Sequence, residues 1–246
     1  MKEEKRERES KVKKKLTKII RIVIVGALLM MIAGCSTTGK GSRAWIEDKV
    51  ANIEKVYPTE NPEDLFEKFP NGFIIKQRRL FKEEDKSYSL ELKMKGDKDT
   101  KKIEGKVKKV LLQSKPYKEI VEKESKVEYI KGQNLVLEKP EFLEDLLPKN
   151  HFLFQKLRLN KTILEKLEFN KKDYTMENGG YGITYNINNN IINTYLGVSS
   201  NLTLRISGIE SSNYNPYKHG IIISDKDKDI YYHELVSEHK EDLYRE

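Results

Sequence analysis

Cysteine, proline and glycine are all scarce in this chain of 246 residues, which has 1 Cys, 7 Pro and 14 Gly. The low glycine and proline content excludes collagen-like and fibrous classes, and a lone cysteine excludes an internal disulfide. The sequence also lacks a G-x-S-x-G elbow, a glycine-rich phosphate loop, a dinucleotide fingerprint and a repeat at solenoid spacing. Because catalytic triads assemble in space, these absences favour a non-enzymatic protein but leave a hydrolase open.

Charge is plentiful: 47 Lys and Arg against 39 Asp and Glu give a formal net charge of +8. Such an excess usually indicates nucleic acid or an anionic membrane as a partner. Residues 1–21, however, hold ten Lys and Arg and four Glu, and the 212 residues after Gly34 hold 37 basic and 35 acidic side chains. Most of the excess therefore belongs to the N-terminal segment.

That segment has the pattern of a secretory signal. Residues 22–33 are uncharged and apolar, and as a helix they would extend roughly 18 Å, well short of the roughly 20 residues that a bilayer core requires. A basic region followed by a short apolar run is typical of a signal peptide and not of a membrane-spanning helix. We expect residues 1–34 to be removed.

The end of the apolar run, Ile32-Ala33-Gly34-Cys35, matches a bacterial lipobox. It predicts cleavage between Gly34 and Cys35 and lipidation of Cys35 as an N-palmitoyl, S-diacylglyceryl cysteine. Two or more acyl chains anchor a protein stably, whereas one does not. The alternative is a buried cysteine in an N-terminal apolar helix. The lipobox predicts a lipid anchor on the extracellular face of the cell membrane, followed by a tether over residues 35–43 and an ectodomain over residues 44–246, so nucleic acid is not an expected partner.

The ectodomain is predicted to have an α+β fold, with one or more antiparallel meander sheets and several short helices packed on one side. Alternating apolar residues predict strands over residues 88–94, 103–112 and 181–187, with further strands over 127–130, 135–137, 202–206, 221–224 and 230–235. Short helices are expected over residues 48–57, after Asn61-Pro62, within 141–168, and from Asn189 to Gly197.

No metal or cofactor is predicted. The run Asp225-Lys226-Asp227-Lys228-Asp229 resembles the start of a calcium loop, but Ile230 and Val236 occupy the positions that need Gly and Glu. A hairpin turn explains the run better. The histidines lack the spacing of a zinc site and are interpreted as surface residues: His151, His219, His233 and His239.

Charge within the ectodomain is uneven. Residues 76–128 carry 17 Lys and Arg against 11 Asp and Glu. These basic strands could face an anionic wall polymer, lipid headgroups or an acidic protein. The alternative, slightly favoured from sequence, is that lysines on a solvated sheet face prevent aggregation of strand edges.

Several segments, in order, resemble the staphylococcal tandem lipoprotein family. They are Val56-Tyr57-Pro58 with Asn61 and Glu63-Asp64-Leu65; Tyr88-Ser89-Leu90-Glu91-Leu92 with Thr100-Lys101-Lys102 and Gly105; Lys172-Asp173-Tyr174 with Asn178-Gly179 and Tyr185; and Leu204-Arg205-Ile206-Ser207-Gly208 with Lys218-His219-Gly220 and Asp229-Ile230-Tyr231-Tyr232. Residues 73–82 depart from the family pattern, which indicates a divergent member. The resemblance implies a membrane-anchored surface lipoprotein of α+β fold without catalytic residues, linked to host-cell entry and innate immune stimulation.

The leading hypothesis is a non-enzymatic surface lipoprotein that acts by contact with a host protein, an envelope protein or an anionic polymer. The alternative is an envelope module that captures a small anionic or saccharide ligand, for which a pocket lined by Tyr181, Tyr185, Tyr195 and Arg205 would be evidence. A wall-active hydrolase is the third hypothesis.

Overall fold

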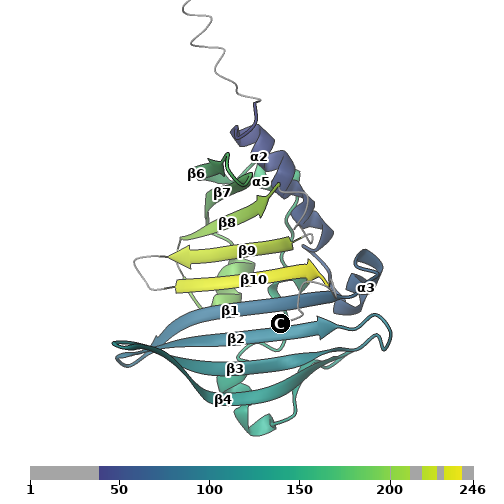
Figure 1. Cartoon of the computed structure of the whole chain (residues 1–246), viewed down its shortest axis with the longest axis vertical. Coiled ribbons are helices and arrows are strands. Elements are labelled where there is room, and N and C mark those ends of the chain that lie inside the picture. Colours follow the sequence, from purple (N-terminus) through teal and green to yellow (C-terminus); the bar gives the residue numbers. More distant parts are fainter. Residues whose placement is uncertain (1–38, 200, 211–217, 226–229, 240–246) are drawn as a thin grey trace, which may run out of the picture.

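The computed structural model describes residues 39–199, 201–210, 218–225 and 230–239, which form a single antiparallel sheet of ten strands (Figure 1). The strand order is β5-β4-β3-β2-β1-β10-β9-β8-β7-β6. Two five-stranded meanders are thus placed side by side, and β1 of the first pairs with β10 of the second. The first meander comprises β1 (Phe73–Glu83), β2 (Lys86–Gly96), β3 (Ile103–Ser114), β4 (Tyr117–Ile130) and β5 (Asn134–Leu137). The second comprises β6 (Glu168–Thr175), β7 (Gly180–Ile187), β8 (Leu202–Ile209), β9 (Lys218–Asp225) and β10 (Ile230–Glu238).

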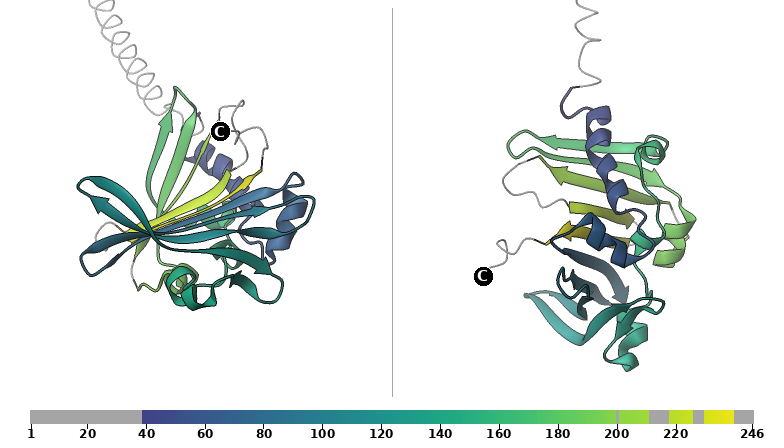
Figure 2. Two further views of the ribbon diagram at one scale, coloured as in Figure 1. Left: turned by 60° about the horizontal axis from the view of Figure 1, so that its bottom comes forward. Right: turned by 90° about the vertical axis from the view of Figure 1, so that its right-hand side faces the viewer.

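The sheet is strongly twisted, so that β6 and β7 run at a steep angle to β1–β4 in the left view of Figure 2. A right-handed twist accumulates from strand to strand in any broad antiparallel sheet. The hairpins β1–β2 and β3–β4 are the longest and extend beyond their neighbours at the left of Figure 1.

Short helices precede each meander. Before β1 come α2 (Arg43–Val50), the 3-10 helices η1 (Ala51–Lys55) and η2 (Pro62–Asp64), and α3 (Leu65–Lys68). Between β5 and β6 come η3 (Pro140–Phe142), α4 (Leu143–Leu146), η4 (Leu153–Gln155) and α5 (Lys161–Leu164), while α6 (Asn190–Leu196) joins β7 to β8.

Local sequence explains where the two longest of these helices begin and end. The side chain of Ser42, a residue of the predicted tether, accepts a hydrogen bond from the Trp45 amide and caps α2, which starts five residues before the predicted position. Asn189 caps α6 by accepting from two backbone amides, and Gly197 ends it at φ 70°, as expected from the sequence.

The helices pack on one face of the sheet, here called the covered face. In Figure 1 they lie behind the strands or along the right-hand edge, and α2 contacts β7 and β8 while α4 contacts β3 and β4. Alternate residues of every strand except β6 point to this face and form one continuous core, which includes Ile75, Leu92, Val107, Ile183, Leu204, Ile223 and Val236. The opposite face, called the open face, has no helix of the described chain packed over it (Figure 2).

The predicted class is confirmed only in its coarse form. The antiparallel meanders and the short helices are present, but the described chain is mostly sheet and not a balanced α+β arrangement. The strands expected from alternating apolar residues are all found within β2–β5 and β7–β10. Strand β6 was not predicted, and it overlaps the expected helical region only at residue 168. It was missed because nearly all its side chains are exposed, so it has no apolar face to recognise.

Candidate functional site: a lysine row on the open face

Four lysines lie directly opposite one another across four neighbouring strands of the open face. This lysine row consists of Lys76 on β1, Lys93 on β2, Lys106 on β3 and Lys126 on β4. Because neighbouring strands are about 4.8 Å apart, the row brings four positive charges within roughly 15 Å. Like charges in directly opposed positions destabilise a sheet, so the lysine row lowers the stability of the folded protein. Lysines placed elsewhere on the open face would keep it solvated without this repulsion.

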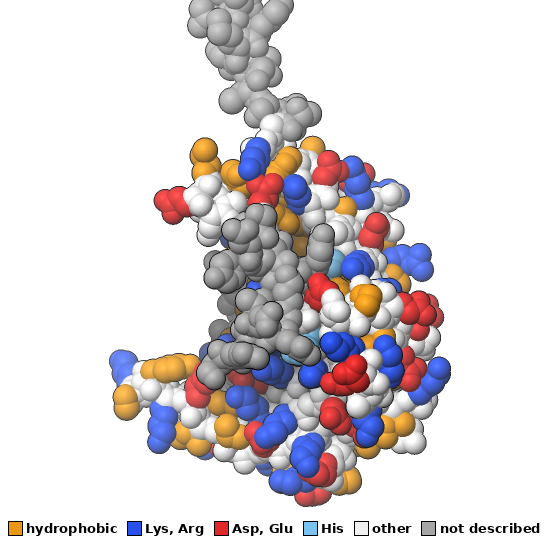
Figure 3. Space-filling model, turned by 45° about the vertical axis from the view of Figure 1, so that its right-hand side comes forward, with side chains coloured by type: hydrophobic (Ala, Val, Ile, Leu, Met, Phe, Trp, Pro, Cys, Tyr) orange, Lys and Arg blue, Asp and Glu red, His pale blue; other side chains and the backbone are white. Residues whose placement is uncertain are grey.

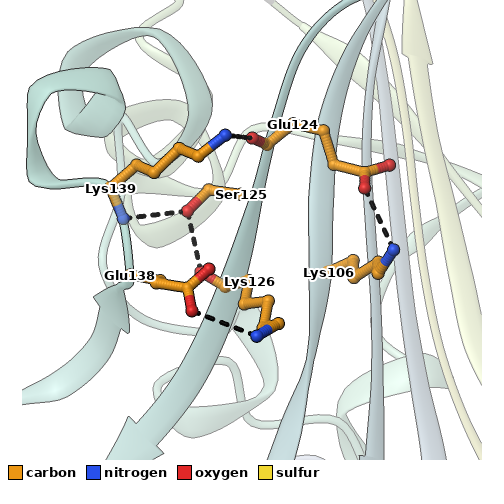
Figure 4. Close-up of polar contacts among 6 residues, drawn as sticks. All are labelled: Lys106, Glu124, Ser125, Lys126, Glu138 and Lys139. Atoms are coloured by element: carbon orange, nitrogen blue, oxygen red, sulfur yellow. Dashed lines mark hydrogen bonds and ion pairs between the residues drawn. The ribbon is translucent and has the colours of Figure 1, made fainter.

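Carboxylates compensate one end of the row. Lys106 Nζ lies 3.0 Å from Glu124 Oε1, and Lys126 Nζ lies 3.1 Å from Glu138 Oε1 (Figure 4). Both pairs are exposed, so each contributes at most about 1 kcal/mol and weakens with salt. Lys139 also reaches the Glu124 carbonyl oxygen, at 3.4 Å.

Lys76 lies at the other end of the row, on β1. Lys76 makes no ion pair within the described part of the chain, and Lys218 on β9 adds a third positive charge near it. Partial burial, together with repulsion from Lys93 and Lys218, lowers the pKa of the Lys76 ammonium. An anion placed here would relieve that repulsion.

The next row of the same face alternates in sign. Glu91 forms ion pairs on both sides, with Lys108 Nζ at 3.1 Å and Arg78 Nε at 3.5 Å. Partial burial acts to raise the pKa of Glu91, but hydrogen bonds from Lys108 and Ser89 outweigh it, and the pKa is lowered. Figure 3 shows basic and acidic side chains interleaved over the lower half of the molecule, which contains β1–β4. The lysine row differs from this neighbouring row in that all four of its positions are basic.

A buried carboxylate lies on the covered face behind this region. Glu234 on β10 is fully buried and accepts five hydrogen bonds. Oε1 accepts from Tyr57 Oη and the Phe154 amide, both at 2.9 Å, and Oε2 accepts from Gln77 Nε2 at 2.6 Å, the Leu153 amide at 2.9 Å and Tyr232 Oη at 3.0 Å.

These donors come from four separate parts of the chain. The Glu234 carboxylate joins the segment before β1, strand β1 and helix η4 to the centre of the sheet. Burial raises the pKa of Glu234, although its hydrogen bonds oppose the shift. All its partners belong to the packed core, so we assign it a structural role. In the sequence, Glu234 could have been found as an acidic residue at a core-facing position, because Tyr232, Glu234 and Val236 are alternate residues along the strand.

The predicted lipidation residues Ile32, Ala33, Gly34 and Cys35 lie outside the described residues, as does the proposed cleavage site. Their chemistry stays a prediction from sequence. Within the described ranges, the helices are all too short or too polar to cross a membrane.

The residues suggested for a ligand pocket do not come together. Tyr181, Tyr185 and Tyr195 lie on the covered face: Tyr181 packs edge-on against Trp45, Tyr185 donates to Glu47 at 3.2 Å, and Tyr195 belongs to the cluster around Glu234. Arg205 points to the open face, where it forms a bidentate pair with Asp173 at 2.6 and 2.9 Å. Because the three tyrosines lie on the covered face and Arg205 on the open face, these four residues do not line one pocket.

The histidine interpretation needs one correction. His219 is 1% exposed and packs against the Phe69 ring, and burial lowers its pKa to about 4. His151 and His233 are half-buried. In the described chain, acidic and histidine side chains form no cluster suited to a metal ion. Strands β9 and β10 pair on either side of the acidic run, and all of that run except Asp225 lies outside the described residues.

Comparison with known proteins adds no identification. No family model matches the chain, and no curated protein matches it. The resemblance to the staphylococcal tandem lipoprotein family therefore stays a prediction from short sequence segments.

Proposed function

We propose that this protein is a lipid-anchored envelope protein that binds an anionic polymer of the cell envelope through its lysine row. The observation that supports this proposal is the in-register alignment of Lys76, Lys93, Lys106 and Lys126 on the open face. Four aligned lysines repel one another in the free protein. A bound ligand with closely spaced negative charges would remove that repulsion, which explains why the alignment is present. The protein acts in this proposal by binding and not by catalysis.

The lipid anchor is the second part of the proposal and rests on Ile32-Ala33-Gly34-Cys35. Anchoring keeps the open face close to polymers at the outer surface of the membrane. Contact with host cells and stimulation of innate immunity, which the family resemblance implies, would be further consequences of the same anchored position. Labelled fatty acid should be incorporated into the chain in living cells and lost in Cys35→Ser. Label that persists in this variant would exclude Cys35 as the lipidated residue.

The lysine row is tested with a double variant, Lys76→Gln with Lys93→Gln. The probe is polyglycerol phosphate, a linear polymer of phosphodiesters, added to the purified full chain at several salt concentrations. We expect the wild-type affinity to fall steeply with salt, because bound cations and anions release their counterions. The double variant should bind at least about tenfold more weakly and with a shallower salt dependence.

A control variant with the same net charge distinguishes loss of the lysine row from loss of positive charge in general. Lys156→Gln with Lys166→Gln removes the same charge from exposed positions on the connection between β5 and β6. This control should bind the polymer within about twofold of the wild type. Equal weakening of both double variants would show that only net charge matters and would overturn the role of the row.

A further inference from the structure

A second region of the open face, formed by β6–β9, contains a polar groove of about 720 Å³. Strands β6–β9 form the upper part of the sheet in Figure 1, and β1–β4, which carry the lysine row, form the lower part. Asparagine, threonine and serine side chains dominate its floor, and the described residues of its lining include no aromatic side chain. Most small-molecule pockets are largely apolar, so this composition points to a ligand that is itself rich in hydrogen-bonding groups.

Two adjacent cross-strand rows form the floor. One runs through Glu168, Asn186, Thr203 and Ser224, and the other through Lys171, Thr184, Arg205 and Ile222. A bulge in β6 brings in Asn170, whose amide donates to Asn186 Oδ1 at 2.6 Å, and Asn186 in turn donates to Glu168 at 3.0 Å. These contacts hold amide and hydroxyl groups in a defined arrangement along the groove.

One buried hydroxyl in the groove has no partner. Thr184 is 4% exposed, and its Oγ1 makes no hydrogen bond within the described chain. Its cross-strand neighbours are Lys171 and Arg205. An unpaired buried hydroxyl costs about 1–3 kcal/mol and is uncommon in folded proteins. The oxygen itself is enclosed, so rotation of the Thr184 side chain about its Cα–Cβ bond is needed to bring Oγ1 to the groove floor, where a ligand hydroxyl would supply the missing hydrogen bond.

The described charges that line the groove have no positive excess. The Arg205 guanidinium is neutralised by its bidentate pair with Asp173, which leaves Lys171 against Glu168 and Asp225. Gly182 leaves room for that guanidinium, since a Cβ there would lie 2.3 Å from Arg205 Nη2. An anionic ligand therefore finds no complementary field among the described residues of the groove, whereas the lysine row offers one.

We propose that the β6–β9 groove binds a neutral polyhydroxylated ligand, namely a segment of an oligosaccharide. Each sugar hydroxyl both donates and accepts a hydrogen bond, which matches a lining of amides and hydroxyls. The proposal is independent of the proposed function, because it uses different strands and a ligand of different charge.

The test uses the purified full chain and three neutral probes, chitotetraose, cellotetraose and maltotetraose, in saturation-transfer NMR followed by titration. The main variant is Thr184→Val, which removes the hydroxyl and keeps the shape of the side chain. It should bind the preferred probe roughly five- to tenfold more weakly while its melting temperature stays equal to or above that of the wild type. Thr203→Val, which removes a second hydroxyl from the floor, should weaken binding to a similar extent.

Lys93→Gln serves as the matched control, because it alters the open face outside the groove. It should leave oligosaccharide binding unchanged, and Thr184→Val should leave binding of polyglycerol phosphate unchanged. Absence of binding by all three probes at millimolar concentration would overturn the proposal. So would wild-type affinity in Thr184→Val, or loss of oligosaccharide binding in Lys93→Gln.

Discussion

Replacement of Glu234 by glutamine tests how the sheet is connected to its helices. The two carboxylate oxygens each accept one backbone amide, Phe154 N on Oε1 and Leu153 N on Oε2, both at 2.9 Å. Glutamine has only one side-chain oxygen. Whichever way its amide is oriented, one of these backbone N–H groups must face an NH₂ group and lose its acceptor. A hydroxyl could rotate to adapt, but a backbone amide in a packed segment cannot.

The expected loss of stability follows from the one backbone N–H group that loses its acceptor. A hydrogen bond to a charged group contributes about 1.5–3 kcal/mol, and the orphaned donor adds its own desolvation cost of about 1–3 kcal/mol. Removal of a buried charge recovers part of this loss. We therefore expect Glu234→Gln to lower the free energy of unfolding by about 2–4 kcal/mol, which corresponds to a melting temperature lower by about 5–15 °C in a domain of this size.

Urea denaturation measures the effect, with Trp45 as the reporter. It is the only tryptophan in the chain, and it packs edge-on against Tyr174 and Tyr181, so unfolding should change its fluorescence. Glu177→Gln, at an exposed position in the turn between β6 and β7, is the control and should change stability by less than about 0.5 kcal/mol. Wild-type stability in Glu234→Gln would refute the hydrogen-bond argument.

The pH dependence gives an independent check of the same residue. Burial raises the pKa of Glu234 in the folded state, so the folded protein holds this proton more tightly than the unfolded chain does. The resulting stability is complete below the ordinary glutamate pKa and is lost as pH rises through the raised value. The stability advantage of wild type over Glu234→Gln should therefore shrink as pH increases above about 4.5. An advantage that grows with pH would mean that hydrogen bonding, and not burial, dominates the pKa.

Three further predictions concern single positions. Burial lowers the pKa of His219 to about 4, so its contribution to the free energy of unfolding is present above about pH 6.5 and falls by up to about 3 kcal/mol as the pH drops toward 4. The stability of His219→Gln should therefore fall less steeply than that of the wild type over this pH range, and an equal fall would contradict the assignment. Gly105→Ala places a Cβ 2.0 Å from the Lys93 carbonyl oxygen and should lower the free energy of unfolding, measured with urea, by about 2–4 kcal/mol. Gly197→Ala, with φ 70° and open space around it, should lower it by only about 1 kcal/mol. Equal losses in the two variants would refute the steric explanation. Asn189→Ala removes the acceptor of two α6 amides and should lower the melting temperature by the equivalent of about 1 kcal/mol, while Asn190→Ala should be nearly neutral.

Much of the sheet was predictable because most of its strands bury one face. In β2 and β7 the residues that face the core alternate with polar ones, and the spacing alone predicted both strands. Strand β1 carried a weaker signal, since Gln77 and Arg79 face the covered side, where they bond to Glu234 and to the Leu196 carbonyl oxygen. Polar residues in core-facing positions obscure the alternation that identifies a strand.

The candidate sites depended on register, which sequence patterns do not supply. The excess of lysines in residues 76–128 was evident from counting, but the alignment of four of them required the pairing of β1 with β2, β2 with β3 and β3 with β4. A shift of one residue in any of these pairs would send a lysine to the covered face. The groove on β6–β9 likewise exists only because two cross-strand rows meet there.

By itself the sequence determined the short apolar run ending in Cys35, the uneven charge, the short helices and most of the strands. These are local properties, set by residues within a few positions of one another. The tertiary structure alone decided that β1 pairs with β10, that Glu234 collects donors from four parts of the chain, and that the tyrosines and Arg205 lie on opposite faces. Those features join residues up to 177 positions apart, and only the packing of the whole sheet brings such residues into contact.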